Sequence, residues 1–146
     1  MKRITFHTAL FAVCIILFSA CKKDNDTVKS REELLTSGQW QLYKLEYDDL
    51  SDALPAEDEF KWWDDCDKDD YVQFLTGGTG YQHEGATKCD SDDPDKTTFI
   101  WQLQNNDNTL VWSWLPPLTI IKLTDKELTL EFVEDSDKNI LYFSKQ

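Results

Sequence analysis

Apolar and polar side chains alternate along most of the chain after residue 38, with the period of two that is typical of half-buried β-strands. In the segment 97–104, for example, Phe99, Trp101 and Leu103 share one face. Eight segments are predicted to be strands, namely 39–47, 71–76, 80–85, 97–104, 109–115, 118–123, 127–134 and 139–145.

Turn-forming residues separate most of these segments. Glycines stand at positions 77, 78 and 80, and the residues at 105–108 are Asn-Asn-Asp-Asn. Strands joined by short connections pair with their sequence neighbours, and eight strands can close into a barrel without exposed edges. The sequence therefore predicts an all-β fold, an eight-stranded antiparallel up-and-down barrel, with an open β-sandwich as the alternative.

Three other segments of the domain depart from the period of two. Ser30 and Glu33 have the spacing of a capping box, which predicts one short N-terminal helix over 30–37. The segments 48–70 and 86–96 are rich in acidic residues and are expected to be long loops. The barrel domain is expected to cover 30–146.

Residues 1–20 have the organisation of a secretory signal peptide. Lys2 and Arg3 form a basic start, an apolar run follows, and two small residues close the segment. The apolar run is about ten residues long, shorter than the roughly 20 that a membrane-spanning helix needs. A buried core helix, the alternative, would leave the basic start and the small residues unexplained.

Cys21 follows these small residues directly, at the end of the run Leu-Phe-Ser-Ala-Cys, which resembles the bacterial lipobox. The resemblance implies that Cys21 carries a lipid anchor and becomes the first mature residue. The polar residues 21–29 then read as a flexible tether. We therefore expect a lipoprotein of the bacterial cell envelope, with plain secretion as the alternative.

The chain is strongly acidic, with 28 Asp and Glu against 15 Lys and Arg and a net charge of -13. This charge repels nucleic acid and anionic lipid headgroups, so neither is an expected partner. The expected membrane contact is through the lipid on Cys21. The hydrophobic content of 40% suffices for one packed domain, and 146 residues are too few for two.

Two cysteines remain in the mature domain once Cys14 leaves with the signal peptide and Cys21 takes lipid. Disulfides form and persist in exported proteins, so a bridge between Cys66 and Cys89 is predicted. A zinc site is the alternative, but zinc needs three or four Cys or His ligands, and His83 is the one histidine left. No cofactor is expected.

Seven short motifs occur in order along the domain: LLT at 34–36, WQL at 40–42, CDKDDY at 66–71, GTG at 78–80, EGATKCD at 84–90, WQL at 101–103 and LTD at 123–125. Over about 34–144 the chain resembles the lipocalin-like lipoproteins of Bacteroidetes. The resemblance implies a small barrel with bridged cysteines, an outer-membrane location, on the periplasmic or surface side, and a role without enzymatic activity.

Aromatic side chains on the inward faces are the ligand-binding candidates. They are Trp40, Phe74, Phe99, Trp101, Trp112, Trp114 and Phe132. An eight-stranded barrel is just wide enough either to be filled by its own side chains or to hold one small ligand. Plain core packing and a site for a small lipophilic molecule both stay open at this point.

Trp62 and Trp63 lie in the acidic segment 48–70 and are candidates for surface contacts. Adjacent exposed indoles can stack on a sugar or contact a partner protein of the envelope. The alternative is that both rings fold over the mouth of the barrel as a plug.

Acidic residues flank both cysteines of the predicted bridge, and carboxylate oxygens are ligands that calcium prefers. The weak calcium candidates are Asp65, Asp67, Asp90 and Asp92. An EF-hand pattern fails because Asp70 stands where that loop requires glycine. No metal is therefore assigned, and a solvated acidic rim is the alternative.

The leading interpretation is a lipid-anchored, lipocalin-like binding module that holds a small apolar or amphipathic ligand. The alternative is a protein- or glycan-interaction subunit of a surface assembly that uses exposed tryptophans and acidic loops. An enzyme is not expected, because no nucleophile motif accompanies His83.

Overall fold

The computed structural model describes residues 28–146. The predicted signal peptide 1–20, the predicted lipid-anchor residue Cys21 and the tether up to residue 27 lie outside the described residues. No helix in the described part of the chain is long and apolar enough to cross a membrane.

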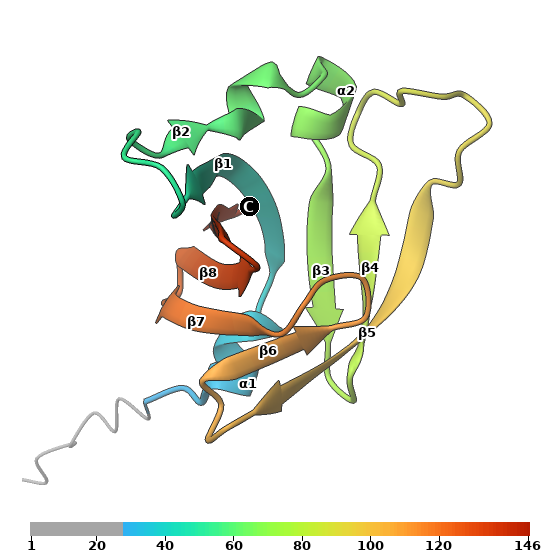
Figure 1. Cartoon of the computed structure of the whole chain (residues 1–146). Coiled ribbons are helices and arrows are strands. Elements are labelled where there is room, and N and C mark those ends of the chain that lie inside the picture. Colours follow the sequence, from blue (N-terminus) through green and yellow to red (C-terminus); the bar gives the residue numbers. More distant parts are fainter. Residues whose placement is uncertain (1–27) are drawn as a thin grey trace, which may run out of the picture.

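Short helical segments and nine strands make up the described residues (Figure 1). The helical segments are α1 (Arg31–Leu35), the 3-10 helix η1 (Glu59–Trp62) and α2 (Asp65–Lys68). The strands are β1 (Gln39–Asp49), β2 (Glu57–Asp58), β3 (Tyr71–Leu75), β4 (Thr79–His83), β5 (Lys96–Gln104), β6 (Thr109–Trp112), β7 (Leu118–Leu123), β8 (Glu127–Glu134) and β9 (Asp137–Lys145).

The strands close into an antiparallel barrel of eight, formed by β1 and β3 to β9. Trp40 of β1 is paired with Val72 of β3 on one side and with Lys145 of β9 on the other. The two-residue strand β2 pairs with the far end of β1, at Glu46 and Tyr47. The predicted barrel is confirmed, and the open sandwich is excluded because β1 and β9 are hydrogen-bonded to each other.

The predicted capping box and the glycine turn are both present. The Ser30 hydroxyl accepts a hydrogen bond from the Glu33 N–H at 3.1 Å, and the Ser30 N–H donates to the Glu33 carboxylate at 2.7 Å. In the β3–β4 turn Gly77 and Gly78 have φ of 94° and 84°, the region that favours glycine. Local sequence therefore accounts for where α1 begins and where β3 reverses.

Helix α1 closes one end of the barrel. Leu35 at its C-terminus is fully buried and belongs to the hydrophobic core. The Leu35 carbonyl also accepts a hydrogen bond from Nε1 of Trp40 at 2.8 Å. The first strand and the helix before it are thus joined both by packing and by a buried polar contact.

A cluster of aromatic rings fills the barrel interior around Phe74. Its ring centroid lies between 5.3 and 5.5 Å from those of Phe99, Trp101 and Trp112, with steep interplanar angles that suit aromatic pairs. Gly80, paired with both Phe74 and Phe99, has no room for a Cβ because the Phe99 ring lies against it. Glycine at this position lets the large rings share the interior.

The prediction that 48–70 is a plain loop was wrong. The segment contains β2, η1 and α2. Asp58 accepts a hydrogen bond from the Phe60 N–H and thereby caps η1, and the Phe60 side chain is buried. The buried Phe60, the pairing of β2 with β1 and the bridge at Cys66 together tie the segment to the barrel, and the alternation of side chains does not reveal them.

The strand predicted over 109–115 ends at Trp112. The chain turns there, and the Leu115 N–H donates to the Trp112 carbonyl at 3.0 Å. Trp114 therefore does not continue the inward face of β6, and its side chain is 45% exposed.

Candidate functional site

A cavity of about 320 Å³ extends from Trp40 near the start of β1 to Trp63 and Asp67 in the segment that carries η1 and α2. This segment lies across the barrel from α1 (Figure 1). We call the end of the barrel beside this segment the mouth. The lining residues are Trp40, Leu42, Trp63, Asp67, Asp70, Tyr71, Val72, Gln82, Trp112, Trp114, Leu115, Leu141 and Phe143. The wall is mostly apolar, and the volume falls at the lower end of the range for small-molecule sites, roughly 300–1,000 Å³.

The buried Phe60 anchors the segment that carries η1 and α2 beside the cavity. The side chains of the neighbouring residues Trp62 and Trp63 have different surroundings. Trp63 packs on Phe60, with ring centroids 5.3 Å apart, and lines the cavity. Trp62 is 76% exposed, and the Lys61 ammonium lies 4.8 Å from the centre of its ring. The two indoles, predicted together as surface contacts, therefore have different surroundings, and only Trp63 fits the plug alternative.

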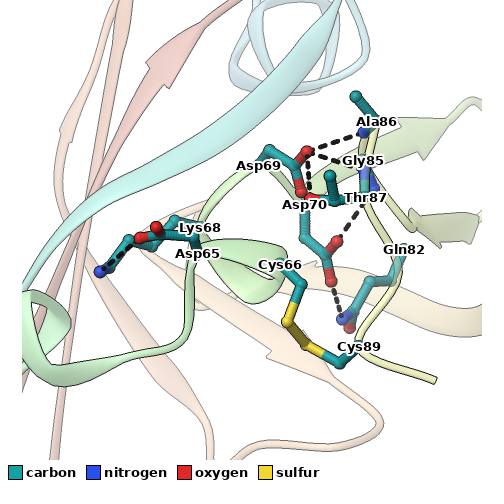
Figure 2. Close-up of a disulfide and its surroundings, with 10 residues drawn as sticks. All are labelled: Asp65, Cys66, Lys68, Asp69, Asp70, Gln82, Gly85, Ala86, Thr87 and Cys89. Atoms are coloured by element: carbon teal, nitrogen blue, oxygen red, sulfur yellow. Dashed lines mark hydrogen bonds and ion pairs between the residues drawn. A yellow bond between two sulfur atoms is a disulfide. The ribbon is translucent and has the colours of Figure 1, made fainter.

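The predicted disulfide between Cys66 and Cys89 is confirmed (Figure 2). It joins α2 to the β4–β5 connection, with Cα atoms 5.2 Å apart. The bridge closes a loop between residues 23 positions apart in the sequence. Closing a loop of that length reduces the entropy of the unfolded chain and contributes about 3 kcal/mol to stability. Because α2 also carries Asp67, the bridge holds one acidic lining residue in place.

Asp69 ties the same connection to the start of β3 (Figure 2). Its Oδ2 accepts hydrogen bonds from the Ala86 N–H at 2.8 Å and from the N–H and hydroxyl of Thr87, both at 3.0 Å. Gly85 has no room for a Cβ because Asp69 lies against it. The Asp69 Oδ1 is buried and has no hydrogen-bond partner among the described residues.

Asp70 and Gln82 give the cavity a polar side. The Gly85 N–H donates to Asp70 Oδ1 at 3.0 Å, and the Gln82 amide donates to Oδ2 at 3.4 Å. Burial raises the pKa of Asp70, the two hydrogen bonds oppose that rise, and the nearby carboxylates of Asp67 and Asp69 add to it. No Lys, Arg or His occurs among the described residues that line the cavity.

The predicted ligand-binding aromatics divide into two groups. The cavity is lined by Trp40, Trp112 and Trp114. The core contains Phe74, Phe99 and Trp101, with Phe132 half-buried against it. Core packing, the alternative, therefore describes the second group and also Trp40 and Trp112, which belong to the core and are 0% and 5% exposed. Trp114 is the one of the seven with a well-exposed ring at the cavity.

The buried indole N–H groups differ in their partners. Nε1 of Trp40 donates to the Leu35 carbonyl and Nε1 of Trp101 to the Thr79 carbonyl, each at 2.8 Å. Trp112 is 5% exposed, and its Nε1 has no partner in the described part of the chain. A buried donor without an acceptor costs about 1–3 kcal/mol, and this one belongs to a ring that lines the cavity.

Sequence reasoning missed more than half of the lining. The missed residues are Leu42, Asp70, Tyr71, Val72, Gln82, Leu115, Leu141 and Phe143. The alternation of Leu141 and Phe143 in the last predicted strand was a usable signal. No signal identified Gln82, because its place depends on its register opposite Val72.

The weak calcium candidates do not come together as a site. The one group of potential metal ligands among the described residues is Cys66, Asp67 and Cys89, and both of its sulfurs are held in the disulfide. The other candidates make local contacts: Asp65 pairs with Lys68 at 3.2 Å, and Asp90 accepts from the Asp92 N–H at 2.9 Å. Thiolate chemistry is therefore absent from this group, and a single carboxylate remains.

His83 stacks on Tyr71, with ring centroids 4.5 Å apart, and meets Tyr81 edge-on at 5.9 Å. Burial lowers the pKa of His83, and the nearby Lys96 ammonium acts in the same direction. Its Nε2 has no hydrogen-bond partner among the described residues. No hydroxyl or carboxylate in that part of the chain therefore forms a catalytic pair with this atom.

Comparison with known proteins adds family and fold. The sequence profile of the lipocalin-like domain matches residues 36–130. No curated protein matches the chain. A crystal structure of a lipocalin-like protein from Bacteroides uniformis ATCC 8492 is 17% identical, with 77% of this chain and 99% of that chain covered and a TM-score of 0.44. One of an uncharacterized protein from Bacteroides eggerthii DSM 20697 is 15% identical, with 75% and 98% covered and a TM-score of 0.39.

Proposed function

The chain belongs to the lipocalin-like domain family, and on this basis we propose that it is a binding module that holds a small apolar or amphipathic molecule in the cavity at the mouth of its barrel. The observation that carries the proposal is the cavity itself, about 320 Å³ in volume and walled mainly by indole, phenyl and aliphatic side chains. Such surfaces release water when an apolar body enters. The role proposed is binding, without a catalytic step.

The shape of the site supports a small occupant. Trp40, Leu141 and Phe143 form part of the wall inside the barrel, and Trp63 covers the site from outside it. Pockets that bury most of a ligand combine an apolar wall with a few polar groups that orient it. Here Asp70 and Gln82 are the groups placed to orient the ligand.

The test is a titration of the purified protein with a panel of lipophilic molecules, followed by calorimetry. Leu115→Trp should fill part of the cavity and weaken binding at least tenfold. Leu123→Trp is the matched control, because Leu123 is half-buried and packs against the core without lining the cavity. Equal binding by both variants, or no binding by the parent protein, would count against the proposal.

We also propose export and lipid anchoring in the outer membrane. The signal-peptide pattern of 1–20 and the lipobox-like cysteine at position 21 support this location. The disulfide supports it too, since such bonds persist in oxidising compartments. Mass spectrometry of the mature N-terminus tests the proposal, which predicts acylated Cys21 in wild type and release of the Cys21→Ser variant from the membrane.

A second candidate function is recognition of a glycan or an envelope protein through Trp62. The supporting observation is that 76% of this large ring is exposed, an unusual state for tryptophan. Trp62→Ala should then abolish partner capture from envelope extracts while leaving the cavity titration unchanged. Capture that is the same for both proteins would remove this candidate.

A further inference from the structure

Resting on the proposed function, the lining of the cavity indicates which class of ligand it holds. Its charged members are two acidic residues, the exposed Asp67 on α2 and Asp70 directly before β3. Asp70 is half-buried, so its carboxylate is less well solvated than one at the surface. A ligand that brings positive charge to this side would restore the lost solvation.

The basic side chains near the cavity contact other groups, and the ammoniums of Lys61 and Lys96 lie over the rings of Trp62 and Tyr81. Lys68 pairs with Asp65 at 3.2 Å, and Lys88 pairs with Asp95 at 2.6 Å. Lys145, whose ammonium lies 5.8 Å from the centre of the Trp40 ring, donates to the Ser37 hydroxyl near α1. The carboxylates of the cavity therefore have no lysine or arginine as an ion-pair partner in the described part of the chain.

Indole rings supply a second attraction for a cation at the same place. Four tryptophans line the cavity, and two of them, Trp63 and Trp114, are 39% and 45% exposed and offer ring surface to a ligand. The other two, Trp40 and Trp112, lie behind them in the core. Tryptophan is the side chain whose π-face attracts organic cations most strongly, and groups of aromatic rings bind alkylated ammonium ions. The same rings also accept an apolar body, so one wall suits both parts of a cationic amphiphile.

We propose that the ligand of the cavity is an organic ammonium compound with an apolar body, whose charged head lies beside Asp67 and Asp70 and whose body lies among the tryptophans. The protein's net charge of -13 favours the approach of such a molecule. Nε1 of Trp112, which has no partner within residues 28–146, can donate a hydrogen bond to an acceptor atom of the body.

The first test uses three probes with one body and different heads: 4-phenylbutylammonium, 4-phenylbutanol and 4-phenylbutanoate. At pH 7 and low salt we expect the ammonium to bind about tenfold more tightly than the alcohol, and the carboxylate to bind most weakly. Equal binding of the ammonium and the alcohol, or tightest binding of the carboxylate, overturns the inference and leaves the proposed function in place. Binding of none of the three overturns both.

The second test assigns the preference to the two carboxylates. Asp67→Asn/Asp70→Asn should bring the ammonium and the alcohol within about twofold of each other, with the alcohol's affinity unchanged. Asp90→Asn/Asp92→Asn removes the same charge from the β4–β5 connection, outside the cavity, and should keep the preference. A preference lost equally in both variants would mean that net charge, and not the cavity, selects the cation.

Discussion

The two ends of the barrel are built from the same kinds of side chain, tryptophan and aliphatic residues with acidic neighbours. At the α1 end, Leu35 is buried in the core, and Nε1 of Trp101 has a backbone acceptor. At the mouth, Trp63 and Trp114 line a cavity, and Nε1 of Trp112 has no partner among the described residues. The indole N–H at the α1 end is therefore hydrogen-bonded within the protein, whereas the indole N–H at the mouth is available to a ligand.

The surroundings of the acidic side chains also differ between the two ends of the barrel. A hollow of about 360 Å³ also lies at the α1 end, and Trp101 and Leu103 share its lining with Glu32, Gln102 and Asp107. Both of its acidic residues are exposed members of a mixed wall. At the mouth, Asp70 adjoins an apolar wall, and burial raises its pKa. Polar groups held in an environment that does not suit them are typical of functional sites. The comparison therefore favours the mouth as the place of the proposed binding site.

The largest expected effect comes from removing one aromatic ring from each region. Phe74→Ala deletes a fully buried ring and should lower the free energy of unfolding by about 4 kcal/mol. Trp114→Ala deletes a ring that is 45% exposed and should lower it by about 1 kcal/mol. Urea unfolding followed by circular dichroism measures both. Equal losses would show that the mouth is packed as tightly as the core.

Removing the disulfide should loosen the mouth more than the α1 end. Cys66→Ala/Cys89→Ala is expected to destabilise the protein by about 3 kcal/mol, because the unfolded chain regains the freedom that the bridge removed. Amide hydrogen exchange should accelerate most in the segments 58–70 and 84–96. Acceleration that is uniform from α1 to β9 would contradict the division into two regions.

The helix cap at the α1 end gives a smaller and more local effect. Ser30→Ala should lower the free energy of unfolding by about 1 kcal/mol, because the Glu33 N–H loses its acceptor. Ser136→Ala, in the exposed β8–β9 turn, is the control and should be neutral. Cavity binding measured by calorimetry should be unchanged in both, and a weakened affinity in Ser30→Ala would couple the two ends.

The smallest expected effect is a difference between Asp70 and Glu46 in how their contributions to stability depend on pH. The pKa of Asp70 is raised in the folded state. Ionisation of Asp70 therefore lowers the free energy of unfolding as the pH rises from the unfolded-state pKa through the higher folded-state pKa. Hydrogen bonds from Lys44 and Tyr142 lower the pKa of Glu46, so its contribution is present at neutral pH and lost on acidification.

Urea unfolding across pH 3 to 8 checks the signs. Relative to wild type, Asp70→Asn should gain stability as pH rises, and Glu46→Gln should lose it. An Asp70→Asn curve parallel to that of wild type would show that folding does not change the pKa of Asp70.

Much of the fold was predictable because it depends on local patterns. The period of two along 97–104 and 127–134 identified strands, and the spacing of Ser30 and Glu33 identified the helix start. The disulfide followed from counting cysteines in a domain that was expected to be exported. Prediction failed at 48–70 and after Trp112, where one buried residue or one turn overrides the local pattern.

Side-chain alternation, turn residues and the cysteine count were thus enough to predict the class of fold, the number of strands around the barrel, the disulfide and an aromatic interior. The three-dimensional structure was needed to show which aromatic rings line the cavity. It also showed that Trp63 lines the cavity whereas Trp62 is exposed to solvent. It also decided that Asp70 and Gln82 share the cavity wall. Alternation along a strand specifies which side chains face the barrel interior. A cavity depends instead on the distance between opposite walls, and that distance is set by barrel closure and by the register between distant strands.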